Sequence, residues 1–239
     1  MLPRHSALGR SRYGKTTQIT LANLDLVVVV LALHEPEFNA HRLDRFLVLA
    51  EASELPAAIV LNKSDLATKT EMKKRFAPII KRYEALGYPV LPVSAETDAG
   101  IPQLRELLKD KISAVVGSSG VGKSSLINAV QPGLRLWVGD VMEIGKGRHT
   151  TTDVTLHPLD FGGYIADTPG VKTVTLIEPE AVQLPMCFPE MRARSSLCKF
   201  NNCSHRHEPG CAVKAAVEAG EIAPERYASY LKMAEDVKK

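Results

Sequence analysis

The sequence lacks any hydrophobic run long enough to cross a membrane. Its longest apolar stretch, Leu24 to Leu33, is interrupted by Asp25 and falls far short of the roughly 20 residues that a membrane-spanning helix needs. Cysteine is scarce, with four residues, and no charged-then-apolar leader opens the chain, which argues against secretion and a disulfide framework. We therefore expect no membrane partner and a reducing compartment, the cytoplasm or an organelle.

Strong net charge is missing as well. A formal net charge of +3 does not by itself indicate a nucleic-acid partner. Charged residues make up 24% of the chain and hydrophobic residues 45%, which excludes wholesale disorder and predicts a globular protein. Residues 1–20 nevertheless contain no acidic residue and four basic ones, Arg4, Arg10, Arg12 and Lys15. This stub is interpreted as a basic arm near RNA, an organellar transit segment, or the solvated remnant of a neighbouring domain.

Strand and helix patterns alternate through the middle of the chain. Continuous apolar runs predict strands that are buried on both faces of a parallel sheet, and these runs span residues 26–33, 57–61, 89–93 and 112–116. Apolar residues at helical spacing separate them, and a hairpin is expected around Gly162-Gly163. The pattern predicts a doubly wound α/β domain over 21–185. The Cys- and His-rich, then helical, remainder predicts a smaller domain over 186–239.

A glycine-rich segment follows the fourth predicted strand and opens a predicted helix. It reads Gly117-Ser118-Ser119-Gly120-Val121-Gly122-Lys123-Ser124, which fits the phosphate-binding pattern G-x-x-x-x-G-K-[ST], and Ser125 comes next. The backbone amides of such a loop wrap phosphate oxygens, and the helix N-terminus favours their negative charge. We expect Lys123 to bind the β- and γ-phosphates, Ser124 to bind Mg²⁺, and Ser125 to belong to the same site.

A guanine-selecting motif, Asn62-Lys63-Ser64-Asp65, directly follows the second predicted strand. This position places it at the carboxyl edge of the sheet, where open α/β sheets bind ligands. Asp65 can accept hydrogen bonds from guanine N1–H and from the exocyclic amine, a donor pair that adenine lacks. Asn62 is expected to brace the loop and contact the base, and the stem of Lys63 to lie along the purine face.

Two further segments complete the predicted nucleotide site. Asp167-Thr168-Pro169-Gly170 matches D-x-x-G, in which the Asp holds Mg²⁺ through water and the Gly amide senses the γ-phosphate. Ser94-Ala95-Glu96 is interpreted as the loop that supports the guanine ring, or else as an ordinary turn. Ordinary small GTPases have the guanine motifs after the phosphate loop, whereas here they precede it. The domain is therefore predicted to be circularly permuted, which compact domains with close termini tolerate.

The motifs do not assign the residue that orients the attacking water in the predicted site. Many GTPases have a Gln after D-x-x-G to orient the attacking water, and here Val171 follows. In the segment between the phosphate loop and D-x-x-G, Thr151 is the expected switch residue for Mg²⁺ and the γ-phosphate. His149, on the same glycine-flanked loop, is the candidate for orienting or activating water; the alternative is a surface histidine that touches phosphate or RNA.

Three of the four cysteines lie in a metal-ligand pattern. Cys198, Cys203, His205 and Cys211 form C-x4-C-x-H-x5-C, which supplies three thiolates and one imidazole and completes a tetrahedral structural zinc shell. His207 is the alternative imidazole by register, and Cys187 is expected to be a plain apolar residue. Because the unit is small, metal is expected to supply much of its folding free energy.

Taken together, these features closely resemble the ribosome small subunit-dependent GTPase A family. The resemblance is carried by the permuted motif order, Gly147 to Thr151, Asp167 to Val171, and His207-Glu208-Pro209-Gly210-Cys211-Ala212-Val213, and it runs from about Leu21 to Lys232. It implies a permuted P-loop GTPase with a C-terminal zinc domain that acts late in small-subunit maturation and depends on the ribosomal particle for rapid hydrolysis.

The resemblance also implies cofactors and partners. GTP or GDP, Mg²⁺ and one structural Zn²⁺ are the expected cofactors, the small ribosomal subunit and its rRNA are the expected partners, and we expect a monomer. Family members usually begin with an OB-fold, of which only a trailing remnant within 1–20 is expected here. Two other interpretations stay open at this point: a GTP/GDP-dependent scaffold with incidental turnover, and an ATP-using P-loop enzyme in which Asn62 to Asp65 match by accident.

Overall fold

The chain divides into two compact units that are interleaved along the sequence. The structure, a computed structural model, describes residues 7–12, 16–134, 155–167 and 184–236. Unit 1 comprises Met1–Gly9, Ile19–Phe38 and Leu55–Thr173, and unit 2 comprises Arg10–Gln18, Asn39–Glu54 and Val174–Lys239. The division into segments 1–20, 21–185 and 186–239 stays a prediction from the sequence.

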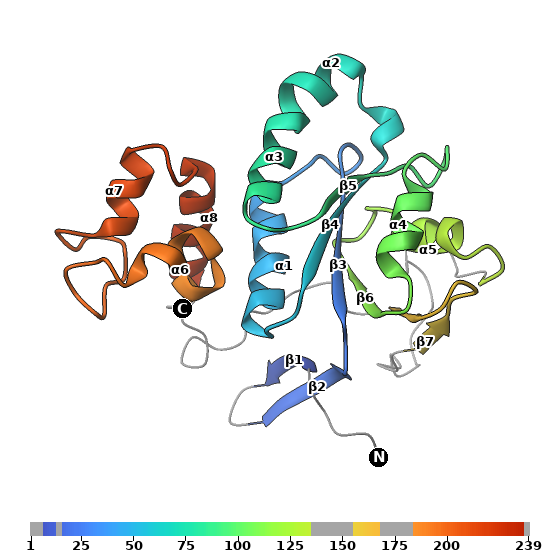
Figure 1. Cartoon of the computed structure of the whole chain (residues 1–239), viewed down its shortest axis with the longest axis horizontal. Helices are drawn as coiled ribbons and strands as arrows, with labels where there is room; N and C mark the ends of the chain where they lie inside the picture. The colour runs from blue at the N-terminus through green and yellow to red at the C-terminus, as the bar shows by residue number, and fades with distance from the viewer. Residues whose placement is uncertain (1–6, 13–15, 135–154, 168–183, 237–239) are drawn as a thin grey trace, which may run out of the picture. The chain divides into compact units, whose positions relative to one another are not determined.

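A six-stranded sheet with the order β5-β4-β3-β6-β8-β7 forms the centre of unit 1 (Figure 1). Its strands are β3 (Leu26–Ala32), β4 (Ala57–Asn62), β5 (Val90–Pro92), β6 (Ile112–Val116), β7 (Thr155–Pro158) and β8 (Tyr164–Asp167). Neighbouring strands are parallel except β7 and β8, which pair antiparallel on either side of Gly162-Gly163. The predicted strands and hairpin are therefore confirmed. Strands β1 (Ala7–Arg12) and β2 (Thr16–Ala22) form a separate two-stranded sheet that the sequence patterns did not predict.

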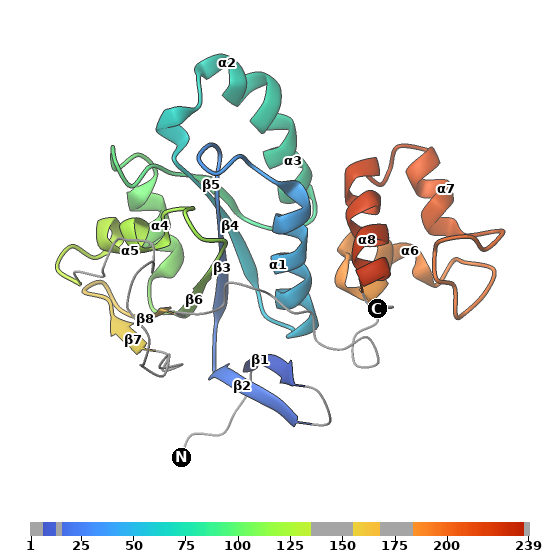
Figure 2. The same ribbon diagram turned by 180° about the vertical axis from the view of Figure 1, so that it is seen from behind.

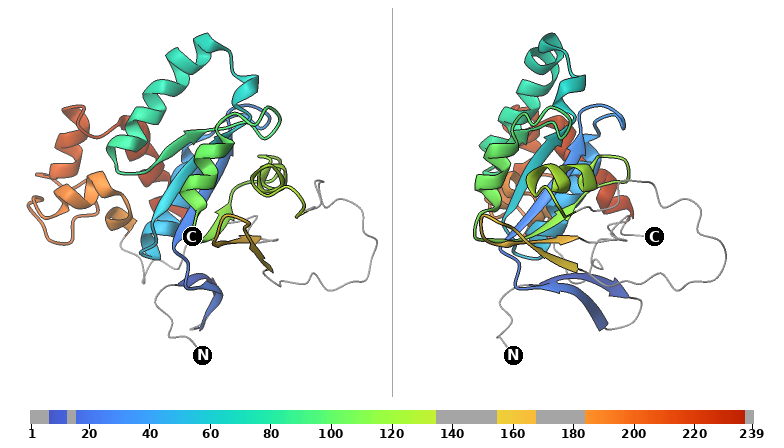
Figure 3. Two further views of the ribbon diagram at one scale, coloured as in Figure 1. Left: turned by 45° about the vertical axis from the view of Figure 1, so that its right-hand side comes forward. Right: turned by 90° about the vertical axis from the view of Figure 1, so that its right-hand side faces the viewer.

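The helices of unit 1 follow the sheet strands in alternation. They are η1 (Ser64–Leu66), α2 (Lys69–Glu71), a π-helical turn (Met72–Phe76), α3 (Ala77–Ala85), α4 (Ile101–Leu108) and α5 (Lys123–Val130). Alternate β3 residues, Val28 and Val30 among them, pack with Leu104 of α4 and Leu126 of α5, so these two helices cover one face of the sheet (Figure 3). Parallel sheets are buried on both faces, and all of β3 is buried accordingly.

Unit 2 combines one helix from the middle of the sequence with the C-terminal segment. Helix α1 (Ala40–Ala52) begins at Asn39, whose Oδ1 accepts the Arg42 backbone N–H at 3.0 Å as an N-cap does. The C-terminal elements are η3 (Leu184–Cys187), α6 (Pro189–Ser195), α7 (Ala212–Glu218) and α8 (Pro224–Asp236), which Figure 2 shows from behind. Val48 of α1 packs in one apolar core with Phe188 and Met233.

A buried ion-pair cluster connects α1, α6 and α8 within unit 2. Arg226 donates from Nε to Glu190 Oε1 at 2.7 Å and from Nη2 to Oε2 at 3.2 Å, while Nη1 donates to Asp44. The side chains are 2% exposed for Arg226, 1% for Asp44 and 8% for Glu190, and the guanidinium lies over the Phe188 ring. Removal of one partner from such a cluster leaves a buried charge uncompensated. Within the described ranges, every helix is too short or too polar to cross a membrane.

Candidate functional site

The predicted phosphate-binding segment, Gly117 to Ser124, connects β6 to α5 at the carboxyl edge of the sheet. Gly117 is required by a close approach, because a Cβ there would lie 2.3 Å from the Val30 carbonyl oxygen. Lys123, the first residue of α5, donates from Nζ to the carbonyl oxygens of Gly117 and Ser118 at 2.8 and 2.9 Å. The next residues, Ser124 and Ser125, are half-buried in the first helical turn, where backbone amides and the helix dipole favour an anion.

Asn62, the last residue of β4, joins three of the predicted nucleotide-binding segments. Its Nδ2 donates to the Val121 carbonyl at 2.9 Å, and its Oδ1 accepts the Ala95 backbone N–H at 3.3 Å. The side chain is 1% exposed. Gly122 makes room for it, since a Cβ at Gly122 would lie 2.5 Å from Asn62 Nδ2. Asn62 therefore holds the phosphate loop and the Ser94-Ala95 loop in fixed positions around the same edge.

The remaining guanine-motif residues lie on short turns beside Asn62. Lys63 adopts a left-handed conformation with φ 58°, and its Nζ donates to the Glu35 carbonyl oxygen. Asp65 is exposed on η1, where its carboxylate is accessible to a base. Ser94 is buried, and its Oγ accepts the backbone N–H groups of Glu96 and Thr97 at 3.2 and 3.1 Å. The hydroxyl thereby shapes the turn that follows β5.

The predicted γ-phosphate side of the site is described only at its start. Asp167 ends β8, opposite Thr155 in the antiparallel pair, so its backbone reaches the same sheet edge as the phosphate loop. Gly170, His149 and Thr151 lie outside the described residues. Their predicted roles in binding Mg²⁺, sensing the γ-phosphate and orienting water stay predictions.

Substitution of Asn62 tests the connection between the two loops. Asn62→Ala leaves the buried Val121 carbonyl without this donor, which costs about 1–3 kcal/mol, and we expect the affinity for GDP to fall by roughly 10-fold or more. Asn62→Asp is the matched variant, since it can still accept from Ala95 but cannot donate to Val121. Titration of GDP and thermal melting of both variants check this; an unchanged affinity in Asn62→Ala would contradict it.

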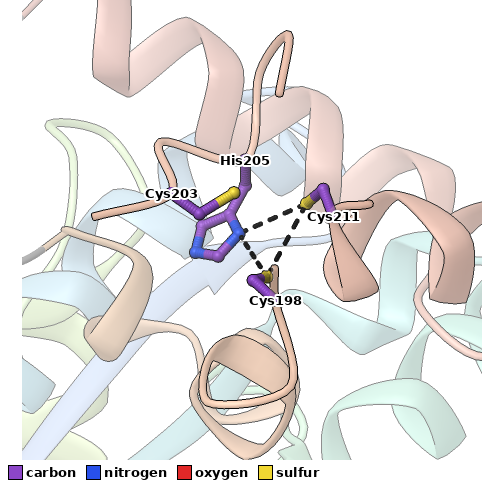
Figure 4. A group of neighbouring side chains, drawn as sticks. All are labelled: Cys198, Cys203, His205 and Cys211. Carbon is purple, nitrogen blue, oxygen red and sulfur yellow. Dashed lines mark hydrogen bonds between the residues drawn. The ribbon is translucent and has the colours of Figure 1, made fainter. Parts of the chain in front are cut away.

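The four predicted zinc ligands converge in unit 2 (Figure 4). Cys198 follows α6, Cys203 and His205 lie on the next loop, and Cys211 precedes α7 and accepts the Lys214 backbone N–H. Their ligand atoms all lie within 4.8 Å of one another. The structure thus groups His205, and not His207, with the three cysteines.

The distances in this group fit a tetrahedral zinc ion. With Zn–S of about 2.3 Å and Zn–N of about 2.0–2.1 Å, tetrahedral ligands lie about 3.8 Å apart for two sulfurs and about 3.6 Å for sulfur and nitrogen. Here Cys198 Sγ is 4.0 Å from Cys211 Sγ, and His205 Nδ1 is 3.5 Å from Cys198 Sγ and 3.4 Å from Cys211 Sγ. Cys198, His205 and Cys211 are thus spaced as three ligands of a tetrahedral ion, and all four ligand atoms lie within 4.8 Å of one another.

Neighbouring groups fix the ring of His205 in the orientation that metal binding needs. The Ser195 hydroxyl donates to the Met191 carbonyl at 2.9 Å and lies 3.3 Å from His205 Nε2. Its remaining lone pairs can accept the Nε2 proton, which leaves Nδ1 as the basic nitrogen that faces the sulfurs. Burial lowers the pKa of His205, so the imidazole favours its neutral, metal-binding form.

The thiol of Cys203 is also affected by its surroundings. Burial, reinforced by the Cys211 sulfur, raises the pKa of Cys203 to about 12.

Comparison with known proteins identifies the family of the chain. The sequence pattern of the family described as RsgA GTPase matches residues 1–177. The chain belongs to the RsgA GTPase family. The resemblance found from the motifs is thereby confirmed, and the chain is a GTP hydrolase.

Two curated RsgA proteins and two solved structures illustrate the similarity. The small ribosomal subunit biogenesis GTPase RsgA of Gemmatimonas aurantiaca is 48% identical over 98% of this chain and 76% of that protein. The protein of the same name from Thermotoga petrophila is 45% identical over 91% of this chain and 72% of that protein.

Among solved structures, YjeQ from Thermotoga maritima has a TM-score of 0.79 at 41% identity, covering 99% of this chain and 76% of that one. YloQ, described as a circularly permuted GTPase, has a TM-score of 0.73 at 30% identity, covering 100% of this chain and 82% of that one. These similarities confirm the predicted permuted α/β fold of this RsgA family chain.

Several residues at the two sites were not predicted from motifs. The Glu35 carbonyl that accepts from Lys63 belongs to a loop with no motif of its own. Ser195 precedes the first zinc ligand by three residues in an ordinary helical sequence. Glu208 lies inside the quoted His207-Glu208-Pro209-Gly210-Cys211 stretch, where its presence between two ligands was the only signal of a local role.

Proposed function

We propose that this RsgA family GTPase acts in the assembly of the small ribosomal subunit and that the small subunit stimulates its turnover. The observation that carries the nucleotide part is Asn62, which connects the phosphate loop to the Ser94-Ala95 loop. The names of the relatives, small ribosomal subunit biogenesis GTPases, support the assembly role. The cytoplasm is the proposed compartment, with an organelle that assembles ribosomes as the alternative, and the chain is proposed to act as a monomer bound to rRNA of the particle.

The proposed roles of the residues follow from their chemistry. Asp65 selects guanine through its carboxylate, and Lys123 neutralises phosphate charge at the N-terminus of α5. Ser124 and Thr151 would hold Mg²⁺ directly and Asp167 through water; when bound, the ion supplies positive charge at the β- and γ-phosphates.

The remaining roles concern water and the γ-phosphate. Gly170 would sense the γ-phosphate through its amide. His149 is proposed to orient the attacking water, because Val171 has no polar group for that task.

Zinc is proposed to bind Cys198, Cys203, His205 and Cys211 in unit 2. The ligand set is complete, with four protein atoms around one position, so a structural role follows and a catalytic one does not. When bound, the ion would join the loop after α6 to the start of α7. Metal binding would therefore contribute free energy to the folding of unit 2.

Phosphate release measured with and without purified small subunits tests the proposed function. We expect stimulation of at least about 10-fold, which requires the particle to lower the barrier by only about 1.4 kcal/mol. Lys123→Ala serves as the control for hydrolysis by contaminating enzymes and is expected to show no turnover above background. Absence of stimulation with tight GTP and GDP binding would favour the scaffold interpretation instead.

A further inference from the structure

The Glu208 carboxylate binds the backbone of the loop between Cys203 and Cys211. Its Oε1 accepts the Ser204 backbone N–H at 2.9 Å, and its Oε2 accepts those of Arg206 and His207, each at 3.1 Å. Three backbone donors on one short loop therefore point at a single side chain. The carboxylate is half-buried and forms no ion pair among the described residues. Besides these amides, the Ser204 side chain also hydrogen-bonds to it.

The loop conformation explains why an anion is needed there. His205 adopts the left-handed region with φ 56°, which a residue with a Cβ adopts only when its surroundings hold it there. Successive backbone N–H groups around such a residue form a concave nest that favours negative charge. Glu208 supplies that charge from within the same loop, three residues from His205 and three from Cys211.

The opposite side of the same loop is held by two tyrosines of α8. The Tyr227 hydroxyl donates to the His205 carbonyl at 2.6 Å, and the Tyr230 hydroxyl donates to the Ser204 carbonyl at 2.5 Å. The N–H groups of this loop thus face Glu208 while its carbonyls face α8. With both sets of backbone groups satisfied, the direction in which the His205 side chain leaves the backbone is fixed.

We propose that Glu208 is a positioning residue of the zinc centre, which fills the backbone nest at 204–207 and so places His205 for metal binding. Among the described residues it forms no hydrogen bond with a ligand atom, and it acts through the loop that carries His205. The inference rests on the zinc site of the proposed function and extends it, because it assigns the preorganisation of that site to one named carboxylate. Without this anion the three amides lose their acceptor and the left-handed turn at His205 loses its support.

Zinc affinity of the intact 239-residue chain tests this role. Affinity is measured by chelator competition for wild type, Glu208→Ala and Glu208→Gln, with Co²⁺ absorption as a second probe of the thiolate ligands. We expect Glu208→Ala to weaken zinc binding by about 10–100-fold, the range found for groups that orient metal ligands. Glu208→Gln keeps an acceptor oxygen without the charge, so its zinc affinity is expected to lie between those of wild type and Glu208→Ala. At saturating Co²⁺ all three should give the same charge-transfer intensity, because the three thiolates remain.

Glu218→Ala is the matched control, since Glu218 is exposed on α7 in the same unit. It is expected to bind zinc as wild type does. An affinity of Glu208→Ala equal to that of Glu218→Ala would overturn the proposal. So would a Glu208→Ala protein whose helical circular dichroism stays reduced at saturating metal, because that result indicates a general folding role. If wild type itself binds no zinc, the zinc site of the proposed function fails, a result distinct from failure of Glu208 alone.

Discussion

Replacement of Asp65 by Asn is expected to reverse the base preference of the nucleotide site. In the proposed site the Asp65 carboxylate accepts two hydrogen bonds from guanine, each worth about 1.5–3 kcal/mol when the acceptor is charged, so loss of this pairing should weaken GDP binding by about 10²–10⁴-fold. Xanthine has a carbonyl where guanine has its exocyclic amine, and an Asn side chain can accept from N1–H while donating to that carbonyl. We therefore expect Asp65→Asn to prefer xanthosine diphosphate.

Titration of both proteins with GDP, ADP and xanthosine diphosphate checks this preference. Binding of xanthosine diphosphate by Asp65→Asn is its own control, because it shows that the variant is folded and that the phosphate loop is intact. A variant that still prefers GDP would contradict the assignment of Asp65. Tight ADP binding by wild type would instead support the ATP-using interpretation, in which Asn62 to Asp65 have no role in base selection.

Removal of a zinc ligand is expected to have the largest effect on stability. Zinc contributes on the order of 10 kcal/mol to the folding of zinc-finger peptides, and each kcal/mol lowers the unfolding temperature of a small domain by about 4–8 °C. Unit 2 also has an apolar core around Phe188 and Met233, so part of its stability is independent of metal. We expect Cys211→Ser to lower the unfolding temperature of unit 2 by more than about 10 °C and to reduce the zinc content well below one ion per chain.

Cys187→Ala is the matched control for this substitution. Cys187 is a buried cysteine outside the zinc cluster, and burial raises the pKa of its thiol to about 11, which keeps it a neutral, apolar group. Its replacement should leave the zinc content unchanged, and scanning calorimetry should show a smaller shift. A chelator should then destabilise wild type and Cys187→Ala alike. Equal stability of Cys211→Ser and wild type would refute a structural metal.

Much of the sheet was predictable because its strands are buried on both faces. Continuous runs such as Leu26 to Leu33 and Ala57 to Leu61 leave no polar alternation, and the observed strands β3 and β4 lie within a residue of them. Helix α5 matches its prediction because glycines and an apolar periodicity mark both its start and its course. The two-stranded β1–β2 sheet was not predicted, because β1 (ALGRSR) has no apolar alternation and β2 (TTQITLA) has only Ile19 and Leu21 in alternate positions.

The sites were predictable as sets of residues but not as connected structures. The motif identified Asn62 as a brace, whereas its partner atoms, the Val121 carbonyl and the Ala95 N–H, depend on the distance between two loops. Spacing predicted the zinc ligands, and the structure groups His205 rather than His207 with the three cysteines. The role of Glu208 follows from the backbone angle of His205, which no side-chain pattern encodes.

Helix α1 gives the division of this chain an unusual topology. The polypeptide runs from β3 into α1 and then into β4, and β3 and β4 are paired strands of one sheet. The α1 side chains Asp44 and Val48, however, belong to unit 2, which is completed by residues near the C-terminus. The units therefore cannot be separated by a single cut in the polypeptide. A fragment that ends before Leu184 would keep Asp44 but lose Arg226, its buried counterion. A fragment that begins at Leu184 would keep Arg226 but lose Asp44 and Val48.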